Sequence, residues 1–131
     1  MARQASVLVC DDFTYTLSGK SNLLGVYTTD IVIPLDPTYA NQLIFLFLIE
    51  TSPDDPYLSL ALHVVLPGGD TRHLALETTR FVPTVADQRR WSLRYPLLFA
   101  NPILRPGPVE AAVLHEKGTI STAAPFIVLA K

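Results

Sequence analysis

The carboxylates of two acidic pairs are the first side chains in this chain whose type and spacing could do chemistry. Asp11-Asp12 and Asp54-Asp55 each place oxygen ligands side by side, and calcium prefers such ligands. If successive strands alternate in direction, Asp54 and Asp55 meet Asp87 at one end of the molecule, where they could bind calcium or a carbohydrate. The competing interpretation is that Asp54-Asp55, which stands between two prolines, shapes a solvated turn. We treat the three residues only as weak calcium candidates, because four cations share that end: Lys20, Arg89, Arg90 and Lys117.

Asp11 occupies a position that a regular strand would bury. It has the same parity as Val9 and Phe13, so an unbroken strand would direct its carboxylate into the core. A buried carboxylate costs several kcal/mol unless it is hydrogen bonded or ion-paired. We therefore expect one of two arrangements: a bulge at 10–12 turns Asp11 outward, or Asp11 caps backbone donors of a neighbouring loop.

The three histidines are the next candidates for metal binding or acid–base chemistry. The strand register argued below makes His63 and His73 diagonal neighbours, and a separation of roughly 7–8 Å is long for two ligands of one zinc ion. His115 is too remote in sequence to place. Nucleophilic catalysis lacks a candidate, because the single cysteine, Cys10, stands beside acids that would raise its pKa. We predict no enzyme activity, no catalytic residue, no metal ligand beyond the weak calcium candidates, and no cofactor.

Alternating apolar residues predict the strands that must position these side chains. Trp91, Leu93 and Tyr95 share one parity, and no segment shows a convincing 3.6-residue repeat. The 131 residues suit one domain, and 11 prolines with 6 glycines divide it into short pieces. We predict a single all-β domain over 1–131, an antiparallel β-sandwich of immunoglobulin-like or C2-like type. Its eight or so strands are expected at 5–17, 22–33, 42–50, 57–66, 71–81, 91–99, 108–116 and 120–129. The expected core contains Trp91, Leu93, Tyr95, Leu60, Leu62, Phe45 and Val113.

The turn near 67–70 should set the register of two neighbouring strands. A three-residue loop at 68–70 would place Leu62 opposite Leu76 and Val64 opposite Leu74, with all four on one face. A two-residue turn would mix apolar and polar residues on that face, so we predict the longer loop with a bulge. Short hairpins are expected at 18–21 and 116–119, and two Pro-rich pieces, 34–37 and 101–108, should cross between sheets.

Composition and charge narrow the classes of function. Ten basic and twelve acidic side chains give a net charge of −2, which provides no attraction to nucleic acid or to anionic membranes. Arg90 and Arg94 fall on the opposite strand face from Trp91, so no stacking platform for nucleic acid is predicted. The longest apolar run, 43–49, is far shorter than the roughly twenty residues of a membrane helix, and no signal peptide is expected. With one cysteine and no internal disulfide, we predict a cytoplasmic protein.

The apolar strand at 43–49 is the most informative feature. Hydrophobic residues make up 49% of the chain and charged residues 17%, and much of the excess lies here, where both strand faces are apolar. An antiparallel sandwich strand normally has one solvated face. Either the Pro-rich 100–108 segment covers the outer face, or that face binds a second copy or another protein. Leu24, Val26 and Val32 continue the apolar set on the adjoining strand.

The interface interpretation predicts a non-enzymatic interaction module, self-associating as a homodimer or binding another protein partner. The alternative is a ligand-binding sandwich that takes calcium or a carbohydrate at its loop acids, and a small enzyme ranks third. Neither nucleic acid nor membrane is an expected partner. The predicted contact residues are Ile44, Leu46, Leu48, Leu24 and Val26.

The N-terminal third of the chain resembles a known family. The pattern runs Val9-Cys10-Asp11-Asp12, then Gly19-Lys20-Ser21-Asn22-Leu23-Leu24-Gly25-Val26-Tyr27, then Asp30-Ile31. It is similar to a family of small uncharacterised bacterial proteins in which a hydrophobic strand ends in an acidic pair. A Gly-Lys hairpin and an aliphatic-Gly-aliphatic-Tyr strand follow in that family, and the Leu66-Pro67-Gly68-Gly69 turn is a further similarity. The resemblance implies a bacterial single-domain β-sandwich, a domain of unknown function, and it implies no activity or catalytic residue.

Overall fold

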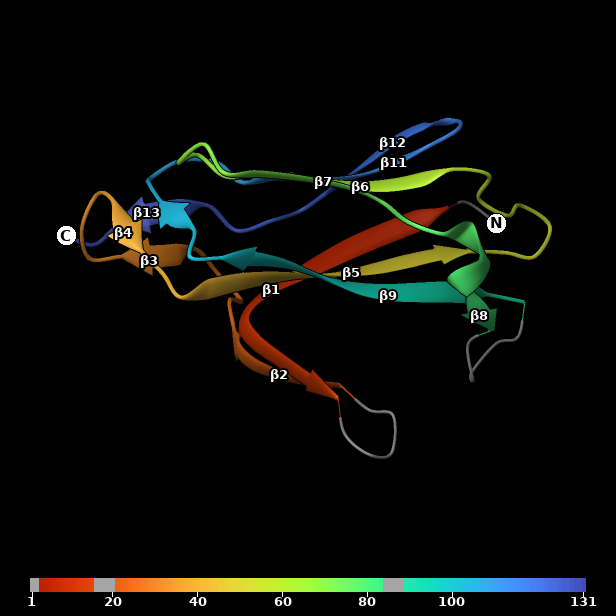
Figure 1. The fold of residues 1–131 in the computed structure, drawn as a ribbon, viewed down its shortest axis with the longest axis horizontal. Helices are drawn as coiled ribbons and strands as arrows, with labels where there is room; N and C mark the ends of the chain where they lie inside the picture. The colour runs from red at the N-terminus through yellow and green to blue at the C-terminus, as the bar shows by residue number, and fades with distance from the viewer. Residues whose placement is uncertain (1–2, 16–20, 84–88) are drawn as a thin grey trace.

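Two β-sheets pack face to face in the computed structural model, which describes residues 3–15, 21–83 and 89–131 (Figure 1). The five-stranded sheet has the order β2-β1-β5-β9-β8, and the four-stranded sheet has the order β12-β11-β6-β7. The first contains β2 (Ser21–Val26), β1 (Gln4–Tyr15), β5 (Gln42–Thr51), β9 (Trp91–Ala100) and β8 (Val82–Pro83). The second contains β12 (Gly118–Thr122), β11 (Glu110–His115), β6 (Leu60–Val65) and β7 (Thr71–Ala75). The predicted all-β antiparallel sandwich is confirmed.

Two short strand pairs lie at the end of the sandwich that carries the C-terminus (Figure 1). β4 (Thr38–Tyr39) pairs with β10 (Ile103–Leu104), so the two Pro-rich connections run beside each other. β3 (Ile31–Ile33) pairs with β13 (Ile127–Leu129) in parallel, an exception to the antiparallel prediction. The single strands expected at 22–33 and 120–129 are therefore each divided in two. Val32 belongs to this parallel pair and not to a strand beside 42–50.

The segment predicted as one strand at 71–81 instead passes from one sheet to the other. β7 ends at Ala75, the short 3-10 helix η1 (Thr78–Arg80) follows, and β8 pairs with β9. Phe81 is buried against Tyr57, with ring centroids 5.3 Å apart. The single-strand prediction was wrong because apolar residues before and after the crossover continue the same alternation. The sequence pattern therefore does not show where β7 ends. Within the described ranges no helix is long and apolar enough to cross a membrane.

The central position of β5 places its odd-numbered residues in the middle of the core. Phe45 and Phe47 are fully buried, and they belong to one cluster with residues of the opposite sheet. Of the seven expected core residues, Trp91 and Tyr95 are partly buried and the other five are buried: Leu93, Leu60, Leu62, Phe45 and Val113. Leu58 belongs to the strand expected at 57–66, where it has the same parity as the inward-facing Leu60 and Leu62, but it is 76% exposed because β6 begins only at Leu60.

The β6–β7 hairpin confirms the predicted faces but not the predicted pairing. Leu62 lies opposite Leu74, not Leu76, and His63 lies opposite His73. The backbone N–H of Leu66 donates to the carbonyl of Asp70 at 2.9 Å, so the loop consists of residues 67–69. The diagonal placement of the two histidines was therefore wrong. A shift of two residues leaves every side chain on its own face, so alternation could not distinguish the two registers.

β1 pairs with β5 only as far as Cys10, and the β1–β2 hairpin bends out of the plane of the sheet (Figure 1). Asp11 is exposed, as the outward alternative predicted, but the turn is made without an inserted residue: Cys10 pairs with Val26 and Asp12 with Leu24 in one register. Opposite the bend, Gly25 has φ of +65°, and a Cβ there would lie 2.3 Å from a carboxylate oxygen of Asp11. The positive φ favours glycine here, and any added Cβ would also force the Asp11 side chain to move. Most of the turn predicted at 18–21 lies outside the described residues.

Candidate functional site

The outer face of the five-stranded sheet is built by alternate residues of its three central strands. On β1, β5 and β9 the even-numbered side chains point away from the other sheet, since their odd-numbered neighbours fill the core. The strand register aligns these side chains in rows across the sheet. Two adjacent rows, the apolar rows, contain no charged residue: Leu8–Leu46–Pro96 and Cys10–Ile44–Leu98.

Polar residues border the apolar rows toward the beginning of β1. The next row combines Leu48 with Ser6 and Arg94, and the row beyond it is polar throughout, with Glu50 at its centre. Arg90 donates hydrogen bonds to the carboxylate of Glu50 at 2.9 Å and to the side chain of Gln4 at 3.2 Å. An apolar centre with a polar rim is the usual arrangement of a protein–protein interface.

Several apolar side chains of this face are accessible. Leu8 is 49% exposed and Leu98 is 41% exposed, although both lie in long paired strands. Leu8 also lines a hollow of about 270 Å³ together with Leu23, which the bent hairpin contributes from β2. The remaining lining residues are Ser6, Leu46, Leu48 and Arg94. The bend at Asp11 thus shapes a mainly apolar depression on the face.

The five predicted contact residues differ in how much of their surface remains free. Leu24 and Val26 on β2 are 53% and 37% exposed, and Leu48 is half-buried. Ile44 and Leu46 keep only 6% and 8% of their surface, so the chain itself covers most of both. The Pro-rich 100–108 segment was one predicted cover, and it lies elsewhere, because it pairs with β4 and packs against the 66–70 turn. A Cβ at Gly68 would lie 2.2 Å from the carbonyl oxygen of Ile103.

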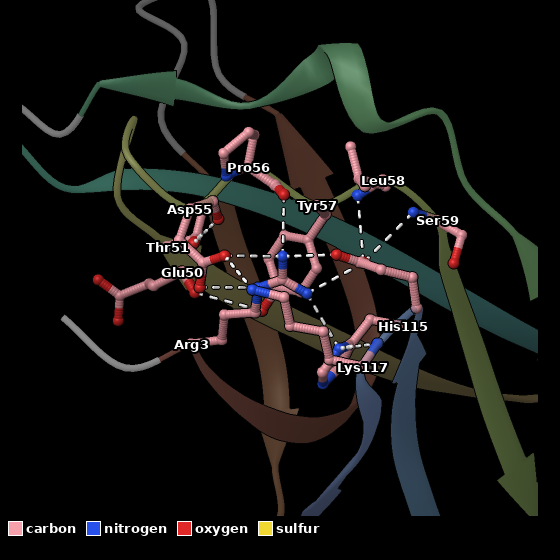
Figure 2. Close-up of polar contacts among 11 residues, drawn as sticks. Arg3, Glu50, Thr51, Asp55, Pro56, Tyr57, Leu58, Ser59, His115 and Lys117 are labelled. Atoms are coloured by element: carbon pink, nitrogen blue, oxygen red, sulfur yellow. Dashed lines mark hydrogen bonds and ion pairs between the residues drawn. The ribbon is translucent and has the colours of Figure 1, made fainter.

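A second polar centre surrounds Arg3, which directly precedes β1 (Figure 2). Its guanidinium donates paired hydrogen bonds to Asp55 at 3.0 and 3.1 Å and to Glu116 at 2.7 and 3.0 Å. It also donates to the carbonyl of Pro56 at 2.8 Å and lies 4.3 Å from the ring centroid of Tyr57. The Arg3 side chain is only 5% exposed. These contacts connect the start of β1 to the 51–56 turn and to the β11–β12 hairpin.

His115 and Lys117 complete this group, which we call the Arg3 cluster: Arg3, Asp55, Tyr57, His115, Glu116 and Lys117. Nδ1 of His115 accepts a hydrogen bond from Arg3 at 3.0 Å and another from the backbone N–H of Lys117 at 3.2 Å. A ring nitrogen that accepts from two donors carries no proton, so the imidazole proton resides on Nε2. Lys117 Nζ lies 2.9 Å from Asp55. The arrangement pairs cations with carboxylates and links three chain segments; it presents no activated nucleophile.

The charges of the Arg3 cluster shift the pKa values of its members. Hydrogen bonds from Arg3 hold the pKa of Glu116 far below its usual range, although partial desolvation opposes them. Hydrogen bonds from Lys117 and then from Arg3 lower the pKa of Asp55. Hydrogen bonding to Glu116 in turn raises the pKa of Arg3, and burial raises the pKa of Tyr57 to about 12. At neutral pH the carboxylates are therefore ionised and paired with cations.

The calcium hypothesis gains no support from this geometry. Both carboxylate oxygens of Asp55 accept hydrogen bonds from Arg3, and Lys117 contacts one of them as well. Asp54 is exposed in the same turn, and Asp87 lies outside the described residues. In the part of the chain that the structure describes, no group of three or more His, Cys, Asp or Glu side chains could hold a metal ion.

Comparison with known proteins adds no family to these observations. No protein-family model matches the chain, and no curated protein matches it. The resemblance of the N-terminal pattern to a bacterial family of unknown function therefore stays a prediction.

Sequence reasoning missed the Arg3 cluster. Arg3 contacts Asp55 and Glu116 across 52 and 113 residues of chain, and no local pattern connects positions so far apart. The expected alternation of strand directions did bring Lys117 to the same end as Asp55, and the structure pairs these two residues at 2.9 Å, but that prediction included neither Arg3 nor Glu116. A charged hairpin turn is ordinarily solvated, and nothing in the sequence marked this one as paired.

Proposed function

We propose that this protein is a non-enzymatic interaction module that forms a homodimer through the outer face of its five-stranded sheet. The observation that carries the proposal is the pair of adjacent apolar rows on that face. Leu8 and Leu98 contribute accessible surface to the rows, and Leu48 and Leu23 extend the apolar area beside Leu8. Leu8, Leu23 and Leu48 line one hollow, and clustered apolar surface on a soluble protein marks a binding site more often than single exposed leucines do.

A second copy of the chain is the partner that suits this face best. In a two-fold dimer each copy presents the same surface, so the accessible apolar side chains of one copy, Leu8 and Leu98 above all, cover those of the other. Sheet faces stack about 10 Å apart, with side chains interdigitating between them. The net charge of −2 produces little repulsion between copies. Cys10 is a free and buried thiol, which supports the proposed cytoplasmic location.

Sedimentation velocity over a dilution series tests the proposal. The wild-type protein should sediment as a dimer that dissociates on dilution. Leu8→Asp and Leu98→Asp should each weaken the dimer by at least about tenfold, because a carboxylate would lose its hydration in the interface. Leu58→Asp is the matched control, because Leu58 is 76% exposed outside this face and its replacement should leave the dimer unchanged.

Circular dichroism of each variant establishes that it is folded before its association is compared. A wild-type chain that is monomeric up to millimolar concentration would overturn the proposal. So would folded variants at Leu8 and Leu98 that dimerise as tightly as Leu58→Asp does.

A further inference from the structure

The outer face of the four-stranded sheet carries two histidines directly opposite each other. His63 of β6 and His73 of β7 form a cross-strand pair, with their Nδ1 atoms 3.4 Å apart. The ring centroids are 5.5 Å apart, and the ring planes are inclined at 63°. His73 is exposed and His63 is half-buried. This face lies on the opposite side of the sandwich from the apolar rows (Figure 1).

The two nitrogens form a long hydrogen bond, and their separation also suits two ligands of one metal ion. Hydrogen bonds donated by an N–H group usually span about 2.7–3.2 Å between heavy atoms. Zinc binds histidine nitrogen at about 2.0–2.1 Å, so two nitrogens at a tetrahedral angle lie about 3.4 Å apart. An ion with ligands at right angles would need about 2.9 Å at the same bond length. The observed spacing therefore corresponds to the tetrahedral geometry that zinc prefers.

The surroundings of the pair leave room for a cation. Three alanines surround the pair on the same face. Ala61 is two residues before His63 along β6, and Ala75 is two residues after His73 along β7. Ala112 of β11 lies opposite His63. None of these three positions carries a positive charge. Glu110 is exposed on the same face, two residues from Ala112 along β11. Small neutral neighbours and a nearby carboxylate favour entry of a divalent cation over its exclusion.

We infer that His63 and His73 form a zinc-binding site on the outer face of the four-stranded sheet. Nδ1 of each ring is a ligand, so the Nδ1–H proton of the donor ring is exchanged through solvent for one on Nε2 of the same ring, and both neutral imidazoles then offer a lone pair to the metal. Two protein ligands leave two positions of a tetrahedral ion for water, whereas structural zinc sites use four protein ligands. The site is therefore solvent-accessible and does not contribute to the core. It is independent of the proposed dimer surface.

Zinc titration tests the site directly, using full-length protein freed of any affinity tag. Calorimetry should give saturable binding of one zinc ion per chain. In NMR spectra the ring signals of His63 and His73 should shift with added zinc, while those of His115 stay in place. His63→Asn and His73→Asn should each weaken zinc binding by at least about tenfold.

His115→Asn is the control for the third histidine, whose Nδ1 is already bonded to Arg3, and it should bind zinc as the wild type does. Absence of saturable binding up to millimolar zinc would overturn the inference, and so would unchanged affinity in His63→Asn. Sedimentation of His63→Asn separates this inference from the dimer proposal, because loss of the zinc site should leave the dimer intact.

Discussion

The hydroxyl of Tyr27 donates a 2.6 Å hydrogen bond to the carboxylate of Asp11 across the bend of β1. Burial, and then this bond to Asp11, raises the pKa of Tyr27 to about 12, so the donor stays protonated at physiological pH. Gln42 donates to the backbone carbonyl of Asp11 at 2.8 Å and anchors the bend to β5. These contacts set the direction in which the β1–β2 hairpin leaves the sheet. They therefore also set the position of Leu23 beside the apolar rows.

Gly25→Ala should destabilise the protein more than an ordinary glycine substitution does. A left-handed backbone costs a non-glycine residue about 1–2 kcal/mol, and here the new Cβ would also collide with Asp11. Gly69→Ala is the matched control, because Gly69 has φ of +104° and a Cβ added there would meet no atom within 4 Å. Urea denaturation should give a larger free-energy loss for Gly25→Ala. The double variant Asp11→Ala/Gly25→Ala should recover part of that loss. If the free-energy losses of the two single substitutions simply add in the double variant, the Cβ at position 25 does not collide with Asp11.

Arg3→Ala should lower the melting temperature by several degrees, because it leaves the carboxylates of Asp55 and Glu116 without their shared donor. Arg3→Lys should be intermediate, since an ammonium group keeps the charge but not the planar fork that serves both carboxylates. Arg80→Ala is the control, because its ion pair with Glu77 is exposed on both sides. Differential scanning calorimetry makes the comparison, and equal melting temperatures for the variants at Arg3 and Arg80 would contradict it.

The Arg3 cluster should also contribute to the loss of stability in acid. Folding lowers the pKa values of Asp55 and Glu116, so their contribution is fully present above the unfolded values of about 4. The contribution is lost as pH falls through the lower folded values. Urea midpoints measured between about pH 6 and pH 3 should therefore fall more steeply for the wild type than for Arg3→Ala. Parallel curves for the two proteins would show that Arg3 does not cause the shifts.

Leu62 and Leu58 provide a matched pair for testing where the inward face of β6 begins. Leu62 is fully buried, so Leu62→Ala should cost about 2–5 kcal/mol of the free energy of unfolding. Leu58 is 76% exposed, and Leu58→Ala should change that free energy by less than about 0.5 kcal/mol. Chemical denaturation of both variants measures the two changes in the free energy of unfolding. A large loss for Leu58→Ala would mean that the strand extends further toward its N-terminal end.

Cys10 should react slowly with thiol reagents while the protein is folded. Its side chain has no exposed surface, and burial, followed by the charge of Asp11, raises the pKa of the thiol. Labelling with a chromogenic disulfide at mildly alkaline pH should be slow in native buffer and fast in urea. Rapid labelling of the native protein would show that the outer face opens at Cys10.

Several features of the fold follow from the sequence alone because they are local properties of the chain. Residues two apart in a strand lie on the same face, so the alternation around Leu62 and along 91–99 predicted strands and their inward sides. The doubly apolar pattern at 43–49 predicted that both faces of this strand need cover, and its place at the centre of the five-stranded sheet came only from the structure. The cost of burying a carboxylate predicted that Asp11 either turns outward at a bulge or caps a neighbouring loop; Asp11 is exposed, but the register has no bulge.

Only the tertiary structure decided which residues from distant parts of the chain meet. Registers that differ by two residues preserve every face, so the pairing of His63 with His73 was not determined by alternation. The Arg3 cluster depends on the ends of three segments far apart in sequence. The small exposed fractions of Ile44 and Leu46 likewise appeared only in the structure, because alternation placed both on an outer face. Such contacts form only when the sheets are assembled, because their geometry depends on the whole fold and not on neighbours along the chain.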